Sequence, residues 1–494
     1  MNQANQAQKA QKNSKTAISP IREENFPEWY QEVVKAADLA ENSPVRGSMI
    51  IKPHGYGLWE NIQRALDDMI KAEGVQNAYF PLLIPLSFIA REAEHIDGFA
   101  KECAVVTHHR LEADADGKLV PAEGAKLEEP FVIRPTSETI IGDAMARWTQ
   151  SYRDLPLLLN QWANVMRWEM RTRLFLRTSE FLWQEGHNAF ETADEADADA
   201  RKMLEVYNDL YENWLAMPGF KGEKSAEERF PGAYRSYTIE MMMQDGKALQ
   251  ACTSHNLGQS FSKSCNIKFQ GRDGKEHHAW TTSWGLSTRS IGGLIMTHGD
   301  DDGLILPPKV APVQVMIIPI IKDENGSAAV YDYADSLVKR LKEIGVRAKV
   351  DKSDARGPDK MWDAIKKGIP VRVEIGAREV EQNALTFVRR DLGRDSKTSC
   401  SPDEFVARIS DVLNQVHNYL YKRAYDMSRE RVQEMKSPAD IKAYFAKEGS
   451  GFAKVPVELL SDNGYEDIRK EFSLSTRCLP FEDEGRTALI GKSY

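Results

Sequence analysis

The feature that most constrains the fold is a break at residues 306–308, where Leu306 is followed by two prolines. Adjacent prolines end regular secondary structure, and the hydrophobic pattern differs on the two sides of this break. Beyond it, short apolar runs alternate with amphipathic runs. This pattern predicts strands at residues 313–320, 346–350 and 371–375, with helices at 331–343 and 360–367. The alternation is typical of an α/β domain with a largely parallel sheet.

A different arrangement is predicted before the break. Residues 237–243 and 247–252 flank Asp245 and Gly246, a dipeptide typical of the tight turn in a β-hairpin. Upstream, apolar residues recur every three or four positions in residues 57–73, as expected of an amphipathic helix. The first part of the chain is therefore predicted to combine antiparallel strands with helices that pack on them.

The chain has 494 residues, which is too long for one hydrophobic core and predicts roughly three domains. Residues 1–20 are rich in Gln, Asn, Ala and Lys, with neither the apolar block of a secretory signal nor the Arg residues of an organellar transit peptide. We predict a disordered tail there. The predicted domains that follow are residues 21–307, 308–402 and 403–494.

Composition excludes several classes of protein. No run of residues is apolar and long enough to cross a membrane, and 41% of the chain is hydrophobic, an ordinary value for a globular protein. The five cysteines are scattered and include no Cys-x-x-Cys pair, which argues against a disulfide framework and a clustered zinc site. We therefore expect a reducing, cytoplasmic compartment and no contact with membranes.

The charge is unevenly distributed along the chain. The formal net charge is −9, yet residues 309–400 carry 18 Lys and Arg against 14 Asp and Glu, whereas residues 188–230 carry 5 against 11. A nucleic acid would meet the more basic segment first. The alternative is that these charges only solvate the surface.

Two Arg-containing motifs follow predicted strands. Arg134, Thr136 and Glu138 come after one apolar run, and Arg167 with Glu169 comes after another. A single Arg near a Glu is usually a surface ion pair worth about 0–1 kcal/mol. Here, however, three further segments combine polar residues with aromatic ones, at 177–187, 250–258 and 283–289. Their number favours a functional interpretation.

In this order, these segments resemble the three signature motifs of class II aminoacyl-tRNA synthetases. The sequences of these segments are most similar to those of prolyl-tRNA synthetases of the archaeal and eukaryotic-like type. The resemblance extends from about residue 25 to residue 494. Residues 52–55 with 79–81 resemble motif 1, which builds the homodimer interface in the family. Residues 167–187 resemble motif 2, and residues 285–308 resemble motif 3.

The resemblance implies a fold and a reaction. Residues 21–307 would form an α+β catalytic domain with an antiparallel sheet flanked by helices, residues 308–402 an α/β anticodon-binding domain, and residues 403–494 a small mixed domain. Overall the chain would be of the α/β class. It would activate L-proline with ATP, release pyrophosphate and transfer proline to tRNA(Pro), as a homodimer.

The resemblance also assigns the residues that bind proline. Thr136 and Glu138 would hold the ammonium group, and Arg167 would contact both the carboxylate and the α-phosphate of ATP. A planar, permanently charged guanidinium suits that bridging role. Arg134 would stabilise the loop that presents Thr136 and Glu138. The full proline set is Thr136, Glu138, Arg167, Trp183, Glu185, His187, His255 and Ser283.

For ATP, the resemblance assigns a second set of residues. The reaction places negative charge on the α-phosphoryl oxygens, so cationic donors are needed there, and Arg167 with Arg289 would supply them. Magnesium would accompany ATP near Gln250, although the sequence contains no dedicated metal cage. The full ATP set is Arg167, Glu169, Arg177, Thr178, Gln250, Thr253, Ser287 and Arg289.

Residues 368–376 resemble part of the anticodon-binding domain of this enzyme class. Arg372, Glu374 and Arg378 would hydrogen-bond the edges of unstacked anticodon bases, which is the usual route to sequence-specific RNA recognition. A surface charge network is the alternative for these three side chains.

The sequence departs from its relatives in two ways. Many of them carry a four-cysteine zinc site near the C-terminus, but here only Cys478 follows Cys400, so we expect no zinc. The last four residues still match the family ending, in which the terminal tyrosine, here Tyr494, lies near the active site. Bacterial-type relatives also insert an editing domain between motifs 2 and 3. The 97 residues from 188 to 284 leave no room for one.

Two other interpretations stay open at the level of sequence. One is a synthetase-like regulator without activity, which the presence of Arg167, Glu169 and Arg289 disfavours. The other is a different class II enzyme, such as a threonyl- or histidyl-tRNA synthetase. The missing editing domain also predicts activation of alanine or cysteine, because an apolar pocket rejects a smaller side chain weakly.

Overall fold

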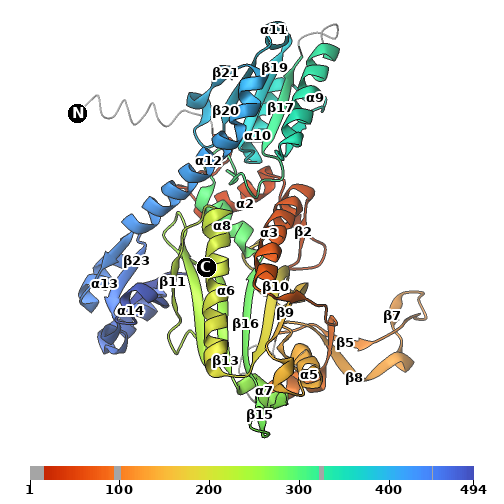
Figure 1. Ribbon diagram of the computed structural model, residues 1–494, viewed down its shortest axis with the longest axis vertical. Helices are drawn as coiled ribbons and strands as arrows, with labels where there is room; N and C mark the ends of the chain where they lie inside the picture. Colours follow the sequence, from red (N-terminus) through yellow and green to blue (C-terminus); the bar gives the residue numbers. More distant parts are fainter. Residues whose placement is uncertain (1–15, 94–101, 322–326, 448) are drawn as a thin grey trace.

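The structure is a computed structural model that describes residues 16–93, 102–321, 327–447 and 449–494. Figure 1 shows a central body built on a large sheet, an α/β domain above it and a small C-terminal domain at its side. The long helix α12 (Pro402–Glu430) runs from the upper domain down to the small one. The two domain types predicted on either side of the proline break are therefore both present.

The central body and the small domain share one sheet of eleven strands, in the order β22-β23-β25-β24-β11-β12-β13-β16-β10-β9-β3. Pairing is antiparallel throughout except at the two ends, where β3 is parallel to β9 and β22 is parallel to β23. The strands are β3 (Gln76–Asn77), β9 (Leu157–Met166), β10 (Glu180–Phe190), β11 (Phe220–Glu223), β12 (Arg235–Met242), β13 (Ala248–Gly258), β16 (Trp280–Ser287), β22 (Val432–Glu434), β23 (Phe452–Pro456), β24 (Ser475–Pro480) and β25 (Thr487–Gly491).

Helices cover one face of this sheet. The longest, α6 (Ala193–Asn213), packs on β13 and β16 and buries Met203, Tyr207 and Leu210 at helical spacing. Thr192 caps its start, since its side chain accepts a hydrogen bond from the Glu195 amide. The other helices of this layer are α2 (Phe26–Ala36), α3 (Pro53–Ala72) and α8 (Arg289–His298). Helix α3 confirms the predicted amphipathic helix and begins four residues earlier.

The predicted hairpin is confirmed. Strands β12 and β13 pair in antiparallel register on either side of Asp245 and Gly246. Gly246 has a φ of +83°, and a Cβ there would lie 2.2 Å from the Ser450 carbonyl oxygen of the small domain. Only glycine combines that backbone conformation with so close an approach. The turn therefore also serves as a contact between domains.

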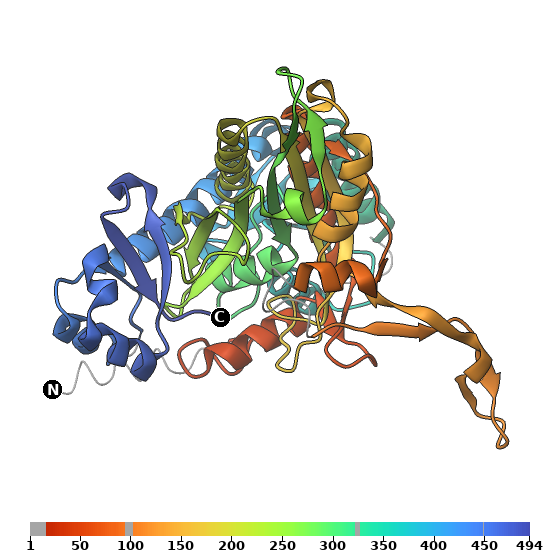
Figure 2. The same cartoon turned by 90° about the horizontal axis from the view of Figure 1, so that it is seen from below.

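A smaller set of elements lies at the other end of the body. A three-stranded sheet leads into a two-stranded hairpin that projects far from the body, as Figure 2 shows. Helix α5 packs near it. These elements are β4 (Leu83–Pro85), α4 (Leu86–Ala93), β5 (Val105–His108), β6 (Leu111–Ala113), β7 (Leu119–Pro121), β8 (Lys126–Ile133), α5 (Glu138–Trp148), α7 (Ser260–Ser264), β14 (Lys268–Gln270) and β15 (Glu276–His278), with β1 (Ala40–Asn42) and β2 (Met49–Ile51) beside α2.

The upper domain has a five-stranded sheet in the order β18-β17-β19-β20-β21. The three predicted strands are present and parallel, whereas β20 and β21 add antiparallel pairs that were not predicted. The elements are β17 (Val315–Ile320), α9 (Ser327–Glu343), β18 (Ala348–Val350), α10 (Gly357–Lys366), β19 (Val371–Gly376), α11 (Ala377–Glu381), β20 (Leu385–Arg389) and β21 (Thr398–Cys400).

The predicted boundary at residues 402/403 is wrong, because it falls at the start of α12 and the first part of this helix still belongs to the upper domain. Phe405 and Ile409 of this helix belong to the core of the upper domain, whereas Val416 and Leu420 pack with Ala216 and other residues of the central body. The small domain therefore begins only after the helix. The α-helices of the small domain are α13 (Pro438–Phe445) and α14 (Asn463–Phe472).

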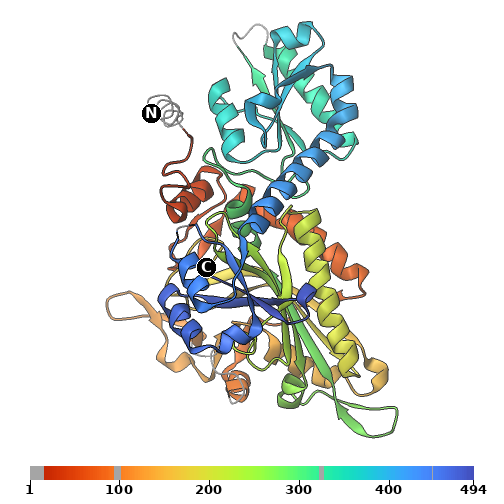
Figure 3. The same cartoon turned by 90° about the vertical axis from the view of Figure 1, so that its left-hand side faces the viewer.

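The predicted tail is also too long. Ile18 is 2% exposed and belongs to the main core, and its amide donates to the Asp301 carbonyl oxygen over 2.9 Å. Residues 16–20 are thus an ordered part of the central body, as Figure 3 shows for the chain that leads into α2. The rest of the predicted tail, residues 1–15, lies outside the described residues.

Candidate active site

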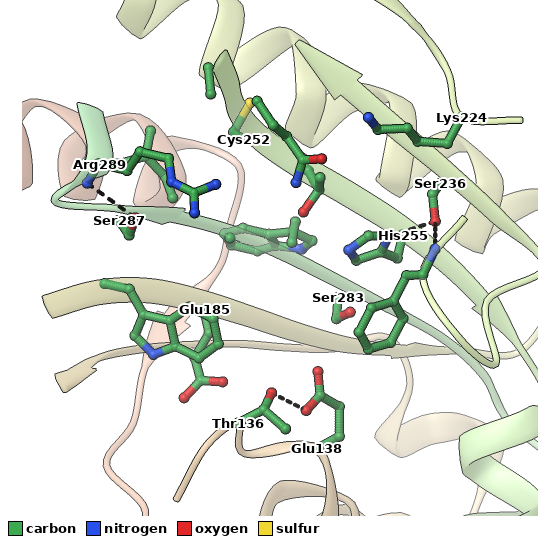
Figure 4. Close-up of a pocket in the computed structure, with 18 of the residues that line it drawn as sticks. Thr136, Glu138, Glu185, Lys224, Ser236, Cys252, His255, Ser283, Ser287 and Arg289 are labelled. Carbon is green, nitrogen blue, oxygen red and sulfur yellow. Dashed lines mark hydrogen bonds between the residues drawn. The ribbon is translucent and has the colours of Figure 1, made fainter. Parts of the chain in front are cut away.

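A cavity of about 340 Å³ opens on the sheet face opposite α6. Alternation along β10 explains its position, since Gln184 points to α6 and accepts from the Tyr207 hydroxyl, while its neighbours point the other way. Figure 4 shows the side chains that converge there. Twelve of the predicted residues line it: Thr136, Glu138, Arg167, Trp183, Glu185, His187, Gln250, Thr253, His255, Ser283, Ser287 and Arg289.

Strand register brings the predicted residues of three strands to the same height. His187 of β10 lies opposite Ser283 of β16, and Ser283 in turn lies opposite His255 of β13. In the same way, Glu185 and Thr253 both lie opposite Gly285. Residues almost 100 positions apart in the chain therefore form one wall, because antiparallel neighbours place their side chains on a common face.

Thr136 and Glu138 lie at the floor of this cavity. Glu138 is the first residue of α5, and the Thr136 hydroxyl donates a short hydrogen bond to its carboxylate. Figure 4 shows the two side chains side by side below His255 and Ser283. A helix N-terminus stabilises a nearby carboxylate, so Glu138 presents a negative charge to the cavity.

Glu185 and His187 form a buried ion pair beside that floor. His187 Nε2 lies 3.0 Å from Glu185 Oε2, and Ser137 and Gln161 donate to Oε1 over 2.6 and 2.9 Å. Burial opposes both charges, yet these hydrogen bonds lower the pKa of Glu185, and the carboxylate raises the pKa of His187. Both directions favour the charged pair, in which the Glu185 carboxylate holds the His187 imidazolium.

Arg167 lies above the floor, held by backbone and aromatic rings. Its Nε donates to the Pro135 carbonyl oxygen over 3.0 Å, and its guanidinium carbon is 5.6 and 5.5 Å from the ring centres of Phe181 and Trp183. Burial lowers the pKa of Arg167, an effect that Glu138 opposes and Arg289 reinforces. The guanidinium is therefore fixed in orientation and close to a second cation.

Arg289 approaches from the other side of the cavity. It begins α8, its Nε donates to the Leu176 carbonyl oxygen over 3.1 Å, and burial followed by repulsion from Arg177 lowers its pKa. The two guanidinium groups are partly buried, and each has its pKa lowered by burial and then by a neighbouring arginine, so an anion would stabilise this site.

Arg134 does not line the cavity. It is 1% exposed, and its guanidinium donates to the Phe80 and Asn164 carbonyl oxygens and to the Asn164 side chain, over 2.7 to 2.9 Å. It ties the loop before Thr136 to β9. That Arg134 supports the loop which presents Thr136 and Glu138 stays a prediction.

Three predicted ATP residues are not brought to the cavity wall. They belong to the segment between β9 and β10, which leaves the sheet after Met166. Glu169 pairs with Arg177 over 2.8 Å, and the Arg177 side chain is 59% exposed. The Thr178 hydroxyl donates to the Glu180 carbonyl oxygen over 2.7 Å and so holds the base of the segment.

Several cavity residues were not predicted, among them Lys224, Ser236 and Phe230. The ring of Phe230 stacks on His255 with 4.7 Å between centres, and Ser236 Oγ lies 2.8 Å from His255 Nδ1. Burial, with help from Lys224, lowers the pKa of His255 to about 3, so this ring is neutral. Lys224 lies within the acidic residues 188–230, where the excess of negative charge does not suggest an anion-binding site. No local motif marks this lysine.

The predicted anticodon residues fall in two places. Glu374 and Arg378 line a cavity of about 320 Å³ in the upper domain, together with Lys397, which lies 3.1 Å from Glu374. Arg372 is 8% exposed and lies 3.7 Å from the Glu374 carboxylate, outside the lining of that cavity. Burial lowers the pKa of Arg372. Arg372 thus contacts this cavity only through its neighbour Glu374.

The C-terminal tyrosine packs against the central body. The Tyr494 hydroxyl donates to the Asp245 carboxylate over 2.6 Å, and the Arg173 guanidinium lies 5.8 Å from its ring centre. Arg173 belongs to the segment between β9 and β10, so the C-terminus contacts the segment that was compared with motif 2.

Within the described residues, no three His, Cys, Asp or Glu side chains are grouped as a metal site would need, and all five cysteines are free thiols. None of the helices in the described part of the chain has the length and apolar character to span a membrane.

Comparison with known proteins identifies the class first. Residues 122–298 match the model of the class II tRNA synthetase core domain for Gly, His, Pro, Ser and Thr, and residues 314–411 match an anticodon-binding domain. With the antiparallel sheet and its motif residues, these matches define a class II aminoacyl-tRNA synthetase.

Relatives then narrow the class to one family. A proline--tRNA ligase of Bdellovibrio bacteriovorus is 54% identical over 95% of both chains, and one of Rhodopirellula baltica is 53% identical over 97% of this chain and 96% of its own. A crystal structure of prolyl-tRNA synthetase from Cryptosporidium parvum superposes with a TM-score of 0.86 at 34% identity, over 97% of this chain and 99% of that one. The chain belongs to the prolyl-tRNA synthetase family. The threonyl- and histidyl-specific alternatives are thereby excluded.

Proposed function

We propose a residue-level account of how this proline--tRNA ligase activates its amino acid. The reaction of the family joins proline to tRNA with ATP as the second substrate. The observation that carries the account is the convergence of Glu138, Arg167 and Arg289 on one cavity. One carboxylate and two guanidinium groups match a substrate with one ammonium group, one carboxylate and a phosphate to attack.

Proline would bind at the floor of the cavity. Its secondary ammonium donates to Glu138 and Thr136, and its carboxylate is held by Arg167. The rings of Phe181 and Trp183 supply an apolar wall on the same side as the Arg167 guanidinium. Glu185 and His187 stiffen this wall through their buried pair.

ATP would lie between Arg167 and Arg289. An oxygen of the proline carboxylate attacks the α-phosphorus, a new bond forms, and the bond to the bridging oxygen breaks as pyrophosphate leaves. Negative charge builds on the α-phosphoryl oxygens in this step. Two prepositioned cations stabilise that charge. An anion beside them also offsets the burial, and the weaker repulsion from a neighbouring arginine, that lower the pKa of each guanidinium in the free protein.

Magnesium would enter with ATP. The donors that fit it are the oxygen of the Gln250 side chain at the cavity wall and the ATP phosphates themselves. Because no cage of carboxylates occurs in the described residues, the ion would depend on the nucleotide for most of its ligands. When bound, it would neutralise charge on the β- and γ-phosphates. Glu169 and Arg177 lie outside the cavity lining but close enough to Arg289 to affect its pKa, so with Thr178 they would contact the nucleotide at the edge of the cavity.

Recognition of tRNA(Pro) would use the cavity of the upper domain. We predict that Arg378→Ala raises the KM for tRNA(Pro) by about 10-fold, the effect of losing one base contact, while proline-dependent ATP–pyrophosphate exchange is unchanged. Arg340→Ala is the matched control, since Arg340 lies ten residues, about 15 Å, further along α9 than the cavity residue Val330. Equal KM values for the two variants would favour a mere surface charge network.

The second step would transfer proline from the adenylate to the 3′ end of tRNA(Pro). A direct test of the whole account is aminoacylation of a tRNA(Pro) transcript with labelled proline. Stable product at the 3′ end supports it, whereas adenylate formation without transfer would leave only the first step. Neither product would be expected of the non-catalytic regulator considered from sequence.

We predict that the enzyme also activates alanine or cysteine. The chain has no editing insertion, and an apolar pocket discriminates by about 1–3 kcal/mol per missing methylene, roughly 10- to 200-fold. Pyrophosphate exchange with alanine or cysteine as the only amino acid measures this activity, with aspartate as a negative control. Exchange at background level with both amino acids would refute the prediction.

The enzyme would be a homodimer formed through the motif 1 region. Large hydrophobic side chains there are exposed, including Tyr79 (72%) and Leu86 (40%), with Trp148 beside Phe80. We predict a mass of twice 55.8 kDa by sedimentation, and a shift to the monomer in Tyr79→Asp/Leu86→Asp. Ile344→Asp, an exposed residue of the upper domain, should not alter the mass. A monomeric wild-type protein would contradict the proposal.

The compartment would be the cytoplasm. The five free thiols, two of them buried, are compatible with a reducing environment. Fractionation of cells places the protein directly, and recovery from an oxidising compartment would contradict this assignment.

A further inference from the structure

Three charged side chains are buried together where the small C-terminal domain joins the central sheet. Lys224 follows β11, Glu240 lies on β12 and Arg477 lies on β24, and their exposed fractions are 3%, 0% and 5%. Charged side chains are almost never buried so completely unless they are paired. This cluster lies outside the proline and ATP sets derived above, although Lys224 itself lines the cavity.

Hydrogen bonds within the cluster connect Arg477 of the small domain, through Glu240, to Lys224 at the cavity. Arg477 Nε and Nη2 both donate to Glu240 Oε2, over 3.0 and 2.8 Å. Lys224 Nζ donates to Glu240 Oε1 over 2.7 Å, and Thr238 donates to the same oxygen over 2.9 Å. The carboxylate is therefore saturated by four donors, and Lys224 is held at the end that faces the cavity.

Two irregularities of strand pairing occur at this cluster. The register of β12 with β13 shifts between Ile239 and Glu240, and the register of β24 with β25 shifts between Thr476 and Cys478, which places Arg477 at the irregularity. A bulge redirects a side chain relative to its strand, and bulges are frequent beside active sites. Both long-range partners of the cluster thus lie where regular pairing is interrupted.

Lys224 is also linked to the wall of the cavity. Its amide donates to the Ser236 carbonyl oxygen over 2.8 Å, and the Ser236 hydroxyl lies between His255 Nδ1 and the Phe230 amide at 2.8 and 3.1 Å. Figure 4 shows Lys224, Ser236 and His255 on one side, with Arg289 and Ser287 on the opposite side. A displaced Lys224 would therefore disturb the proline end more than the ATP end.

We propose that Arg477 is a positioning residue for amino-acid activation, acting through Glu240 to hold Lys224 and the Ser236–His255 wall of the cavity. The small domain thereby contributes to the active site without touching substrate. The inference rests on proline activation as the reaction of this cavity. It also gives the small domain a function that does not depend on the four-cysteine zinc site of many relatives, which we expect to be absent here.

The test measures steady-state pyrophosphate exchange in Arg477→Leu, Arg477→Lys and Lys224→Met, with KM for proline, KM for ATP and kcat determined separately. Arg469→Leu is the matched control, because Arg469 lies in the same domain but pairs with Glu466 at the surface. We expect Arg477→Leu to raise the KM for proline about 10-fold, with kcat and the KM for ATP changed less than about threefold. Arg477→Lys should recover part of the loss, and Arg469→Leu should match the wild type.

A double-mutant cycle separates positioning from general destabilisation. Because both residues act through the same wall, Arg477→Leu/Lys224→Met should be no worse than Lys224→Met alone. An unchanged KM for proline in soluble Arg477→Leu, or losses that multiply in the double variant, would overturn the proposal. So would a fall in kcat that tracks the unfolding temperature while KM is constant. If Arg477→Leu is insoluble, the cycle is run with Arg477→Lys, which keeps the charge but loses the two-pronged contact. Proline-dependent exchange by the wild-type enzyme tests the proposed function without any variant. A failure of that function is therefore distinguished from a failure of the role proposed for Arg477.

Discussion

Replacement of Arg167 by alanine is expected to lower kcat for proline-dependent ATP–pyrophosphate exchange by roughly 10²- to 10³-fold, because one of the two donors that meet the developing phosphoryl charge is lost. The guanidinium is anchored by the Pro135 carbonyl oxygen and lies over two rings, so its removal leaves no other cation in its place. Exchange rates at saturating proline and ATP measure the effect.

Two companion variants sharpen this result. Arg167→Lys keeps the charge but not the planar fork, and it should stay at least tenfold below the wild type. Arg147→Ala removes an exposed arginine on α5, paired one turn away with Asp143, and should leave exchange unchanged. Near-normal exchange in folded Arg167→Ala would show that this side chain does not bridge the substrates.

The second large effect is expected for Glu138→Gln. This change keeps the shape of the side chain and its contact with Thr136 but removes the charge that faces the proline ammonium. Loss of one partner of a desolvated charge pair costs about 2–5 kcal/mol, roughly 30- to 5,000-fold in kcat/KM for proline. Glu128→Gln, an exposed position on β8, is the control.

The distribution of that loss between substrates is diagnostic. The KM for ATP should be nearly unchanged in Glu138→Gln, since the carboxylate lies at the floor of the cavity, away from Arg289. A loss shared equally between proline and ATP would instead indicate that α5 had shifted, and the ammonium-binding role would then be withdrawn.

Local patterns predicted much of the fold because they depend on neighbours in the chain. The hairpin around Gly246 and the first three strands of the upper sheet are examples. The continuous sheet was not predictable in this way. It depends on pairing between Gly222 and Pro480, whose strands carry no local signal for each other.

Helix α12 illustrates a second limit. Its apolar stripe is regular from Phe405 to Leu420, but the stripe packs first on one domain and then on another. Periodicity identifies the buried face of a helix without identifying the body that covers it. The boundary at residues 402/403 was therefore misplaced, and Ile18, a single apolar residue in a polar run, was left in the tail.

The candidate site, too, could be predicted only in part from the sequence. Residues within motifs, such as Glu185 and His187, were placed by resemblance, and strand alternation brings them to one face. Lys224 was missed because its importance comes from Glu240 and Arg477, which lie in other parts of the chain. The three buried charges come from distant parts of the chain, so the sequence contains no regular spacing that would reveal the cluster.

The most direct measurement of the central account is amino-acid-dependent ATP–pyrophosphate exchange by the purified wild-type enzyme, with proline, threonine and histidine tested separately. The account predicts rapid exchange with proline and background exchange with threonine and histidine, because the rings of Phe181 and Trp183 beside Arg167 suit the apolar proline ring rather than a polar side chain. Exchange that is equal for all three amino acids, or absent with proline, would contradict it.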